Sequence, residues 1–588
     1  MANKPKLLSP AGSMQALKSA ISSGADEVYL GGVDFNARIN ATNFDRNALI
    51  KAGEICRNAN VSLNITLNTL IYDKEFKSVL EYVSFLAEHV HPDSLIVQDL
   101  GLAVTLRREF PQIALHASTQ MRIHSHLDAE YLKSLGFTRA VLARELPKED
   151  IDLFVKTGLE TEIFVHGAIC VSESGGCLMS SVIGSRSGNR GECAQPCRLP
   201  YRHENKYPLS LKDMCLAPHI KEISDIGVTA LKIEGRMKSP EYVGAVTSVY
   251  RKLIDENRNA TGEEIKYLAN IFSRSGFTDG YFVSKIDKNM FGIRREDDKR
   301  ITEKTSFRPI AVKKRDEREK ITVPTECIIP ERDEEKTLHP SKQKGFVLRF
   351  EGNLPSDDFF GKYAPIAARI DVPLAMCSDK RVLKYAEKVS VIMPRNIFVS
   401  ELDHVKKQLE NAKKSGIKNA TISSLNHITL CENMYLHGDY AFNVINRETV
   451  AFLEKYSLSS VMLSPETDGK FVRFSKCALE YIGYGRTPLM HTRTCIIKNL
   501  MPCKNKEKCY AVLTDRTGAK FPIISGNNHT NTIYNSLPAY RLDRKRELKK
   551  CGVGMLTLMF TDESEKKMEE VIKLYLSGEK PKFEYTRR

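Results

Sequence analysis

Short apolar runs alternate with amphipathic segments over roughly the first 240 residues of the chain. Segments such as "SMQALKSAISSGA" and "SHLDAEYLKSLGF" repeat apolar residues at helical spacing. Short apolar runs between helices are typical of parallel strands buried on both faces. We therefore predict a (β/α)8 TIM-barrel-like domain, with an open doubly wound sheet as the alternative. The eight predicted strands lie in "KLLSPAG", "EVYLGG", "VSLNITLN", "SLIVQDLG", "ALHASTQ", "RAVLARE", "EIFVHGA" and "ALKIEGR".

Three blocks of the second half align, in the same order, with blocks of the first half. "YLKSLGFTRAVLARE", which ends at Glu145, aligns with "FLEKYSLSSVMLSPE", which ends at Glu466. "LETEIFVHG" aligns with "LEYIGYG", and "GVTALKIEG" aligns with "GVGMLTLMF". Strand-like runs "FVLRFEG", "VSVIMP", "NATISS" and "YAFNVI" precede these blocks. Ordered internal similarity indicates a repeated unit, so we predict a degenerate second barrel-like α/β domain.

The length of the chain and one charge-dense stretch predict the domain boundaries. A chain of 588 residues exceeds one ordinary core. Residues 294–343 are rich in charge and poor in apolar side chains, which indicates an exposed linker. We expect a barrel domain with a cysteine loop at 1–293, the charged linker at 294–343, and the second domain at 344–588.

Composition narrows the class of protein. Apolar residues make up 42% of the chain and charged residues 27%, which is ordinary for a globular protein. The sequence shows no secretory signal and no apolar stretch that would span a membrane, so we expect a cytoplasmic protein without a membrane partner. The net charge of +15 favours polyanions such as RNA, although soluble proteins of other kinds also carry such charge. Trp is absent, so any base stacking must use Phe, Tyr, His or Arg.

Four cysteines lie in one glycine-rich segment, "CVSESGGCLMSSVIGSRSGNRGECAQPC", after the predicted seventh strand. They are Cys170, Cys177, Cys193 and Cys197, with gaps of six, fifteen and three residues. A reducing cytosol argues against disulfides, and four converging thiolates need a cation between them. Paired short spacings are usual for zinc, whereas iron–sulfur clusters accept varied spacings, so these gaps favour a cluster. Zinc and unrelated thiols remain alternatives.

A second group of cysteines occurs in "TRTCIIKNLMPCKNKEKCYAV". Cys495, Cys503 and Cys509 have gaps of seven and five residues, and no fourth cysteine follows closely. Three thiols would need an outside ligand to complete a metal site, so we favour a decayed site.

Polar residues at the predicted strand ends are candidates for catalysis and binding, because barrel enzymes keep their chemistry at that face. Each of these side chains could equally cap a loop or form a structural ion pair. The candidate catalytic residues are His166, Glu145 and Lys232, and the candidate substrate-binding residues are Arg122, Arg144, Arg236 and Lys238. Arg236 and Lys238 follow the eighth strand, where barrels often bind phosphate.

The first half of the chain contains the motifs "EIFVHGAICVSESGGCLMSS", "LLSPAGSMQALKSAISSGADEVYLGG", "FNARINATNF", "GNRGECAQPCRLPY" and "LKIEGRMKSPEYV". Through these motifs the sequence closely resembles the collagenase-like peptidase family U32. The second half resembles the carboxy-terminal region of longer bacterial members through "YGRTPLMHTRTC" and "NTIYNSLPAYRLDR". The family name implies proteolysis. Resemblance to its better understood members instead implies hydroxylation of a 23S ribosomal RNA cytidine or a transfer RNA wobble uridine. Resemblance to other members implies a part in oxygen-independent ubiquinone hydroxylation.

The resemblance also implies a cofactor and a co-substrate. The cysteine spacing matches that of members with a 4Fe-4S cluster, which assigns Cys170, Cys177, Cys193 and Cys197 as its ligands. Prephenate is implied as the hydroxyl source of the RNA-acting relatives, and an electron donor as a partner. Arg122 and Arg144 are candidates for binding such a dicarboxylate in a bidentate manner.

Three functions therefore remain in view. RNA base hydroxylation requires a redox centre, a polar pocket and a surface for RNA. Proteolysis would require catalytic machinery, and the chain contains neither H-E-x-x-H nor G-x-S-x-G, although a Cys nucleophile paired with His166 is conceivable. A non-catalytic iron–sulfur scaffold or assembly factor would contain the same cysteines.

Overall fold

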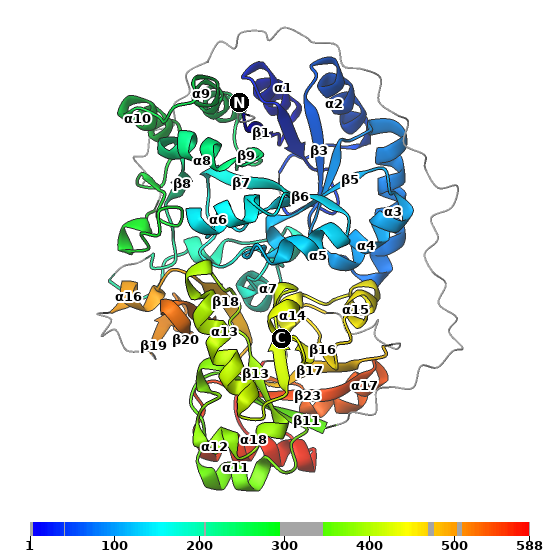
Figure 1. Ribbon diagram of the computed structural model, residues 1–588, viewed down its shortest axis with the longest axis vertical. Coiled ribbons are helices and arrows are strands. Elements are labelled where there is room, and N and C mark those ends of the chain that lie inside the picture. The colour runs from blue at the N-terminus through cyan, green and yellow to red at the C-terminus, as the bar shows by residue number, and fades with distance from the viewer. Residues whose placement is uncertain are drawn as a thin grey trace. The chain divides into compact units, whose positions relative to one another are not determined.

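The computed structural model describes residues 4–39, 41–204, 207–293, 345–467, 475–501 and 509–586 (Figure 1). Contacts divide the chain into two compact units. The first comprises Met1–Leu70, Glu75–Ile329 and Thr492–Leu500, and the second comprises Ile71–Lys74, Pro330–His491 and Met501–Arg588. Each unit thus includes one short segment from the other half of the sequence. The predicted charged linker at 294–343 lies entirely outside the described residues and stays a prediction.

The first unit contains a closed barrel of eight parallel strands. Its strands are β1 (Lys6–Pro10), β2 (Glu27–Leu30), β3 (Ser62–Leu67), β4 (Ser94–Val97), β5 (Ala114–Ala117), β6 (Phe137–Val141), β7 (Glu160–Gly167) and β9 (Ala230–Ile233). Strand β9 pairs with both β1 and β7, which closes the barrel. Each strand overlaps one of the eight apolar runs, so the predicted TIM-barrel-like fold is confirmed.

Helices surround this barrel, and several begin at a side-chain cap. They are α1 (Met14–Ser22), α2 (Arg46–Asn58), α3 (Phe76–Phe85), α4 (Leu100–Glu109), α5 (Asp128–Ser134), α6 (Lys148–Val155), α8 (Ile220–Ile226), α9 (Pro240–Glu256) and α10 (Gly262–Ile271), whereas α7 (Met179–Gly184) lies within the loop after β7. The Ser13, Asp45 and Asp99 side chains accept backbone N–H bonds at the starts of α1, α2 and α4. In the described part of the chain, no helix has both the length and the apolarity needed to cross a bilayer.

The second unit repeats the plan. Its parallel strands are β11 (Gly345–Phe350), β12 (Arg369–Pro373), β13 (Val389–Ile392), β14 (Asn419–Ile422), β15 (Tyr435–Gly438), β16 (Ser460–Met462), β17 (Ala478–Gly485) and β23 (Val553–Phe560). Strand β17 pairs with both β16 and β23, and β23 pairs with β11, so this barrel also closes. The prediction of a second barrel-like domain is confirmed.

Helices also flank the second barrel. They are α11 (Asp357–Tyr363), α12 (Lys380–Leu383), α13 (Val399–Lys414), α14 (Asn426–Leu430), α15 (Arg447–Glu454), α17 (Lys545–Lys550) and α18 (Glu565–Ser577). A four-stranded sheet, which the sequence pattern did not predict, follows β17 and consists of β18 (Pro488–Thr492), β19 (Tyr510–Thr514), β20 (Lys520–Ser525) and β21 (Asn531–Tyr534).

The repeat extends to details outside the barrels. Short strand β8 (Asp213–Cys215) pairs antiparallel with the end of β7, and short strand β22 (Ala539–Tyr540) does the same with β17. Strand β8 also pairs with β10 (Phe277–Thr278). One expected strand is wrong, because "YAFNVI" forms a 3₁₀ turn, Tyr440–Phe442, that ends at Asn443 with a φ of +53°. The strand precedes it as β15, and the left-handed residue prevents an extended run.

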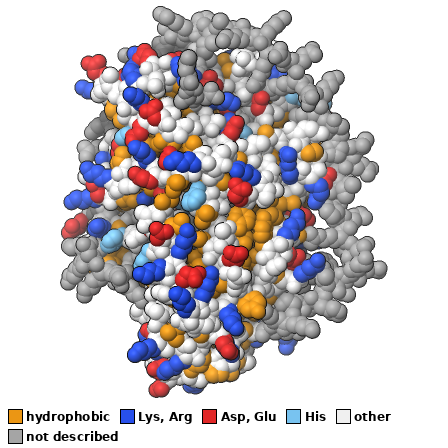
Figure 2. All heavy atoms as spheres, in the orientation of Figure 1, with side chains coloured by type: hydrophobic (Ala, Val, Ile, Leu, Met, Phe, Trp, Pro, Cys, Tyr) orange, Lys and Arg blue, Asp and Glu red, His pale blue; other side chains and the backbone are white. Residues whose placement is uncertain are grey.

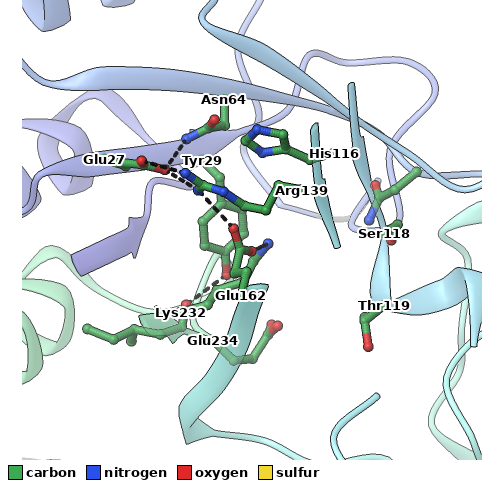
Figure 3. A network of polar contacts seen from close by, with 12 residues as sticks. Glu27, Tyr29, Asn64, His116, Ser118, Thr119, Arg139, Glu162, Lys232 and Glu234 are labelled. Carbon is green, nitrogen blue, oxygen red and sulfur yellow. Dashed lines mark hydrogen bonds and ion pairs between the residues drawn. The ribbon is translucent and has the colours of Figure 1, made fainter. Parts of the chain in front are cut away.

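A buried network of charges fills one layer of the first barrel (Figure 3). Arg139 on β6 donates to both carboxylate oxygens of Glu27 on β2, at 2.6 and 3.0 Å. It also donates to Glu162 on β7 at 3.2 Å, and Glu162 accepts a second bond from Lys232 at 2.7 Å. Burial alone would raise the pKa of Glu27, but the hydrogen bond and charge of Arg139 lower it to about 2. The barrel therefore depends on matched charges at positions where barrels usually contain apolar residues.

Replacing Arg139 with Met should destabilise the protein by about 3–5 kcal/mol, because Glu27 and Glu162 would be left buried without their shared cation. Denaturant unfolding at pH 7 measures this loss. The control is Arg108→Met, which removes an exposed pair with Glu109 and should cost about 1 kcal/mol or less. Equal stability of the two variants would contradict this account.

Because the pKa of Glu27 is lowered, its stabilising contribution is present above its ordinary pKa and should disappear as the pH falls toward about 2.

Candidate active site at the mouth of the first barrel

The cysteine loop follows β7 and packs against the carboxyl end of the barrel. Gly175 has a φ of +76°, and a side chain there would collide with the backbone carbonyl of Gln120, which follows β5. Gly191 has a φ of +85°, and a side chain there would collide with the carbonyl of Asn36, which follows β2. Only glycine combines this left-handed backbone with so close an approach. The loop is thereby fixed against two separate strand ends.

Polar contacts hold the same loop at other strand ends. Arg190 donates to both carboxylate oxygens of Glu75, at 2.9 and 2.6 Å, and the Leu70 N–H donates to the Asn189 carbonyl at 3.0 Å. Arg144, after β6, donates to the Ser174 hydroxyl at 2.9 Å. The segment between the first and fourth cysteines thus contacts the ends of β2, β3, β5 and β6.

The four loop thiols lie within electrostatic reach of one another. Burial raises the pKa of Cys177 well above its ordinary value, and the other three thiols add to the rise. Burial likewise raises the pKa of Cys193, with a further contribution from Cys170. Mutual effects of this kind require short separations. Within the described residues, no three or more His, Cys, Asp or Glu side chains form a group that could hold a metal ion.

Cations and a backbone N–H face these sulfurs. Arg38 lowers the pKa of Cys193 against the effect of burial, and the Gln195 N–H lies 3.3 Å from the Cys193 sulfur. Burial raises the pKa of Cys197 to about 12, although Arg198 lowers it. Such positive groups and N–H donors favour deprotonated sulfur, which is the form that binds metal. An all-sulfur donor set with these neighbours fits a thiolate-bound iron–sulfur cluster.

Beside the loop, two arginines hold one buried carboxylate. Glu234, after β9, accepts from Arg38 at 3.3 Å and from Arg144 at 3.4 Å. Burial would raise the pKa of Glu234, but these guanidinium groups hold it below its ordinary value. The Arg144 guanidinium also lies 3.9 Å from the centre of the Phe164 ring. Two cations against one anion leave positive charge at the barrel mouth, which suits an anionic ligand.

Arg236 also lies at the carboxyl end, but its contacts are internal. It donates to Thr66 at 3.1 Å, Asn36 at 3.0 Å and Asn43 at 2.7 Å, and it is only 4% exposed. Burial lowers its pKa to about 10. These bonds hold the loop after β2 in place, so Arg236 has a structural role here and its predicted role in substrate binding stays untested.

A second cluster at the mouth joins two more predicted residues. The His124 Nε2 lies 2.6 Å from Glu145 Oε1, and both side chains are buried. Arg122 has a φ of +60° and lies 3.7 Å from Glu173 of the cysteine loop. Burial lowers the pKa of His124, but Glu145 outweighs it and the net shift is upward. Glu145, Arg122 and Arg144 thus share one end of the barrel with the cysteine loop.

Three predicted residues lie elsewhere. Lys232 is inside the barrel, bonded to Glu162, with its amine 4.5 Å from the centre of the Tyr29 ring (Figure 3). His166 lies on β7, where its side chain packs among Tyr242, Tyr250 and Phe277, and burial lowers its pKa to about 3. The Lys238 amine lies 2.8 Å from the centre of the Phe272 ring. None of these contacts places the three side chains with the loop thiols.

The second cysteine group is divided between the units. Cys495 belongs to the first unit and Cys509 to the second, whereas Cys503 lies outside the described residues.

On the face drawn in Figure 2, Lys and Arg side chains are interspersed with Asp and Glu, so the net positive charge is not gathered into one patch there.

Comparison with known proteins gives the family. The profile described as Peptidase family U32 matches residues 12–291 and 379–575, which is most of the chain and covers a large part of each barrel. The chain belongs to peptidase family U32. Both halves of this U32 protein therefore carry the family's sequence pattern.

Curated relatives of this U32 protein have more than one activity in their names. It is 38% identical over 293 residues to the 23S rRNA 5-hydroxycytidine C2501 synthase of Escherichia coli, covering 48% of this chain and 43% of that protein. It is 33% identical to the tRNA hydroxylation protein P1 of Bacillus subtilis, covering 49% of this chain and 74% of that protein. It is 34% identical to a Collagenase of Porphyromonas gingivalis, covering 48% and 74%. The alignment thus spans less than half of the first relative.

Sequence reasoning missed Arg38, His124, Glu173 and Arg493 as site residues of the U32 barrel. Arg38 lies in the "FNARINATNF" motif, which carries part of the resemblance to the family. His124 lies four residues after the run "ALHASTQ", and this closeness to a predicted strand end is the signal that points to it. Arg493 donates to the backbone carbonyl of Glu145 from far away in the sequence, and no local pattern connects the two residues.

Replacing Gly191 with Ala should loosen the cysteine loop, because the new side chain meets the Asn36 carbonyl in a left-handed backbone. A local loss of about 1–3 kcal/mol would speed amide exchange in residues 170–198 by roughly 5- to 150-fold. Hydrogen–deuterium exchange with mass spectrometry measures this change. Gly184→Ala is the matched control, since that glycine lies in the same loop with open space around it. Unchanged exchange in the Gly191 variant would show that the close approach is not needed.

Proposed function

We propose that this protein hydroxylates a base in ribosomal or transfer RNA, at the mouth of its first barrel. The observation that carries the proposal is the packing of a four-thiol loop against the strand ends, next to Arg38, Arg144 and Glu234. The two relatives named for rRNA and tRNA hydroxylation support the reaction class. The identity of the RNA, the position of the modified base and the partner molecules are parts of this proposal.

The proposed cofactor is a 4Fe-4S cluster on Cys170, Cys177, Cys193 and Cys197. When bound, such a cluster supplies reversible one-electron chemistry. The residues of the chain would set its environment, because Arg38 and Arg198 offset the negative charge of the thiolates. The mutual proximity of the four thiols supports a cluster, whose ligands are spread over several ångströms, and zinc is the alternative. An electron donor is a further proposed partner.

Arg144 and Arg38 are the proposed binding groups for an anionic co-substrate such as prephenate. Both already hold a carboxylate, that of Glu234, so their geometry suits carboxylate recognition. Arg144 Nε is buried and has no hydrogen-bond partner, which leaves one donor for a ligand. Arg122, which faces Glu173, is a less direct candidate.

Peptide hydrolysis is the second candidate, and the relative named Collagenase favours it. A cysteine protease would need a histidine beside its thiol. The His166 side chain contacts Tyr250, Tyr242 and Phe277, so the pairing of His166 with Cys170 gains no support. A non-catalytic iron–sulfur scaffold would keep the loop but form no modified nucleoside.

Deletion of the gene should remove one hydroxylated nucleoside from ribosomal or transfer RNA. Mass spectrometry of nucleosides from the two purified RNA classes measures the loss, and the wild-type gene should restore the product. Cys193→Ser should fail to restore it, because the loop would lose one sulfur. Cys551→Ser, which changes a partly exposed thiol in the second unit, should restore it fully.

An unchanged nucleoside profile in both RNA classes would end the hydroxylation proposal. Hydrolysis of gelatin or peptides by the purified protein, retained in Cys193→Ser, would then favour a peptidase that does not use the four-thiol site.

A further inference from the structure

The first barrel contains a buried histidine–carboxylate pair at its carboxyl end. His124 follows β5 and Glu145 follows β6, and their side chains meet with Nε2 2.6 Å from Oε1. The exposed fractions of the two side chains are 3% and 8%. The other ring nitrogen of His124, Nδ1, lies 2.8 Å from the backbone carbonyl of Arg122.

These two contacts determine where the protons lie. A carbonyl oxygen only accepts hydrogen bonds, so Nδ1 must carry a proton. If Nε2 and Glu145 both lacked a proton, two acceptors would face each other at 2.6 Å, which is repulsive. One further proton therefore lies between Nε2 and Oε1, and burial keeps water from separating the pair. The raised pKa of His124 agrees with protonation of both ring nitrogens, giving an imidazolium beside a carboxylate.

Glu145 is held from a second direction by residues of the first unit. Its backbone carbonyl accepts a bond from Arg493, which belongs to the segment Thr492–Leu500 of that unit. The next residue, Thr494, is 2.6 Å from the Tyr281 hydroxyl. Tyr281 in turn interacts electrostatically with Glu145 and Cys170, which sets the pair and the cysteine loop in one neighbourhood. Among the described residues, Oε1 of Glu145 forms the bond to His124, and Oε2 has no hydrogen-bond partner.

The second barrel supplies an internal comparison. Arg122 and Asn443 each end a 3₁₀ turn in the left-handed region, with φ of +60° and +53°. In each barrel, the carbonyl of the residue after this turn accepts a backbone hydrogen bond from the loop that follows the sixth strand. In the first barrel the Ala143 N–H donates to Ile123 at 3.1 Å, and in the second the Ser464 N–H donates to Val444 at 3.0 Å. This correspondence matches Glu145 with Glu466, and His124 with Ile445.

The second barrel thus keeps the backbone and the carboxylate but has a buried isoleucine in place of the imidazole. The fold itself does not require a histidine at this position. The pair with Glu145 belongs to the barrel that also has the four-thiol loop, which indicates a chemical rather than a structural need.

We propose that Glu145 is a catalytic residue that exchanges a proton with the substrate through Oε2, and that His124 is its positioning residue. The proposal rests on the proposed function. In the transfer, the bond between the substrate and its proton breaks and an O–H bond forms at Oε2. The electron pair stays with the substrate, and His124 keeps both of its protons. The proton then passes to solvent, and no electrons are exchanged in this step.

Nuclear magnetic resonance of protein labelled with ¹⁵N-histidine tests the protonation state without any need for activity. His124, assigned by comparison with the His124→Gln variant, should show both ring nitrogens protonated at neutral pH. The second proton should be lost only above the ordinary pKa range of histidine, because the charged groups that face the ring are Glu145 and Glu173. A neutral ring at pH 7 would overturn the proposal.

The catalytic role is tested by the rate at which the hydroxylated nucleoside accumulates after induction in the deletion strain. Glu145→Gln should slow accumulation by about 10²- to 10⁴-fold. His124→Ile, which copies the second barrel, should also slow it strongly, whereas His124→Gln should retain part of the rate because its amide can donate to Oε1. Glu466→Gln is the matched control and should match the wild type.

Wild-type rates in Glu145→Gln or His124→Ile, with normal product from the wild-type gene, would overturn the inference while the proposed function stands. Equal losses in His124→Ile and His124→Gln would show that donation to Oε1 is not what matters, and would also overturn it. A lack of product from the wild-type gene would instead end the proposed function, and the protonation measurement would still test the pair.

Discussion

The close approach of the cysteine loop to the barrel mouth is the constraint on which the site depends. At Gly175 and Gly191 the loop backbone lies so near the carbonyls of Gln120 and Asn36 that no side chain fits between them. This contact sets the four thiols beside Arg38, which itself follows β2. It also places Glu173 and Ser174 within reach of Arg122 and Arg144. Without this packing the thiols would belong to a surface loop, and the arginines at the strand ends would face solvent.

Charge is arranged in two layers of the first barrel. The inner layer pairs Arg139 and Lys232 with Glu27 and Glu162, so its charges balance and its role is structural. The second barrel has a comparable layer, in which Arg369 bonds Asp371 and Glu480. At the mouth of the first barrel, arginines outnumber the carboxylate they hold, and this excess is what an anionic ligand would meet. The two barrels therefore share a scaffold, and they differ in the chemistry added to its carboxyl end.

The sequence predicted the barrel strands well, because a strand buried on both faces is a local apolar run. The second barrel could be predicted because its blocks follow the same order as those of the first. The strand predicted at "YAFNVI" was wrong, since an apolar run does not reveal a left-handed residue such as Asn443. The direction of individual side chains, such as that of His166, could not be predicted in the same way. The pairing of β7 with β9 is irregular between Phe164 and His166, and such a shift changes the face on which the following residue lies. The contact of Arg493 with Glu145 joins residues 348 positions apart, which no local pattern encodes.

The iron and acid-labile sulfide content of protein purified without oxygen tests most directly whether the four thiols form one site. The wild type should be brown and contain about four iron and four sulfide per chain. Single Ser substitutions at Cys170, Cys177, Cys193 or Cys197 should each lower both contents together. Colourless wild-type protein with stoichiometric zinc, or iron content that none of the four substitutions changes, would contradict the assignment.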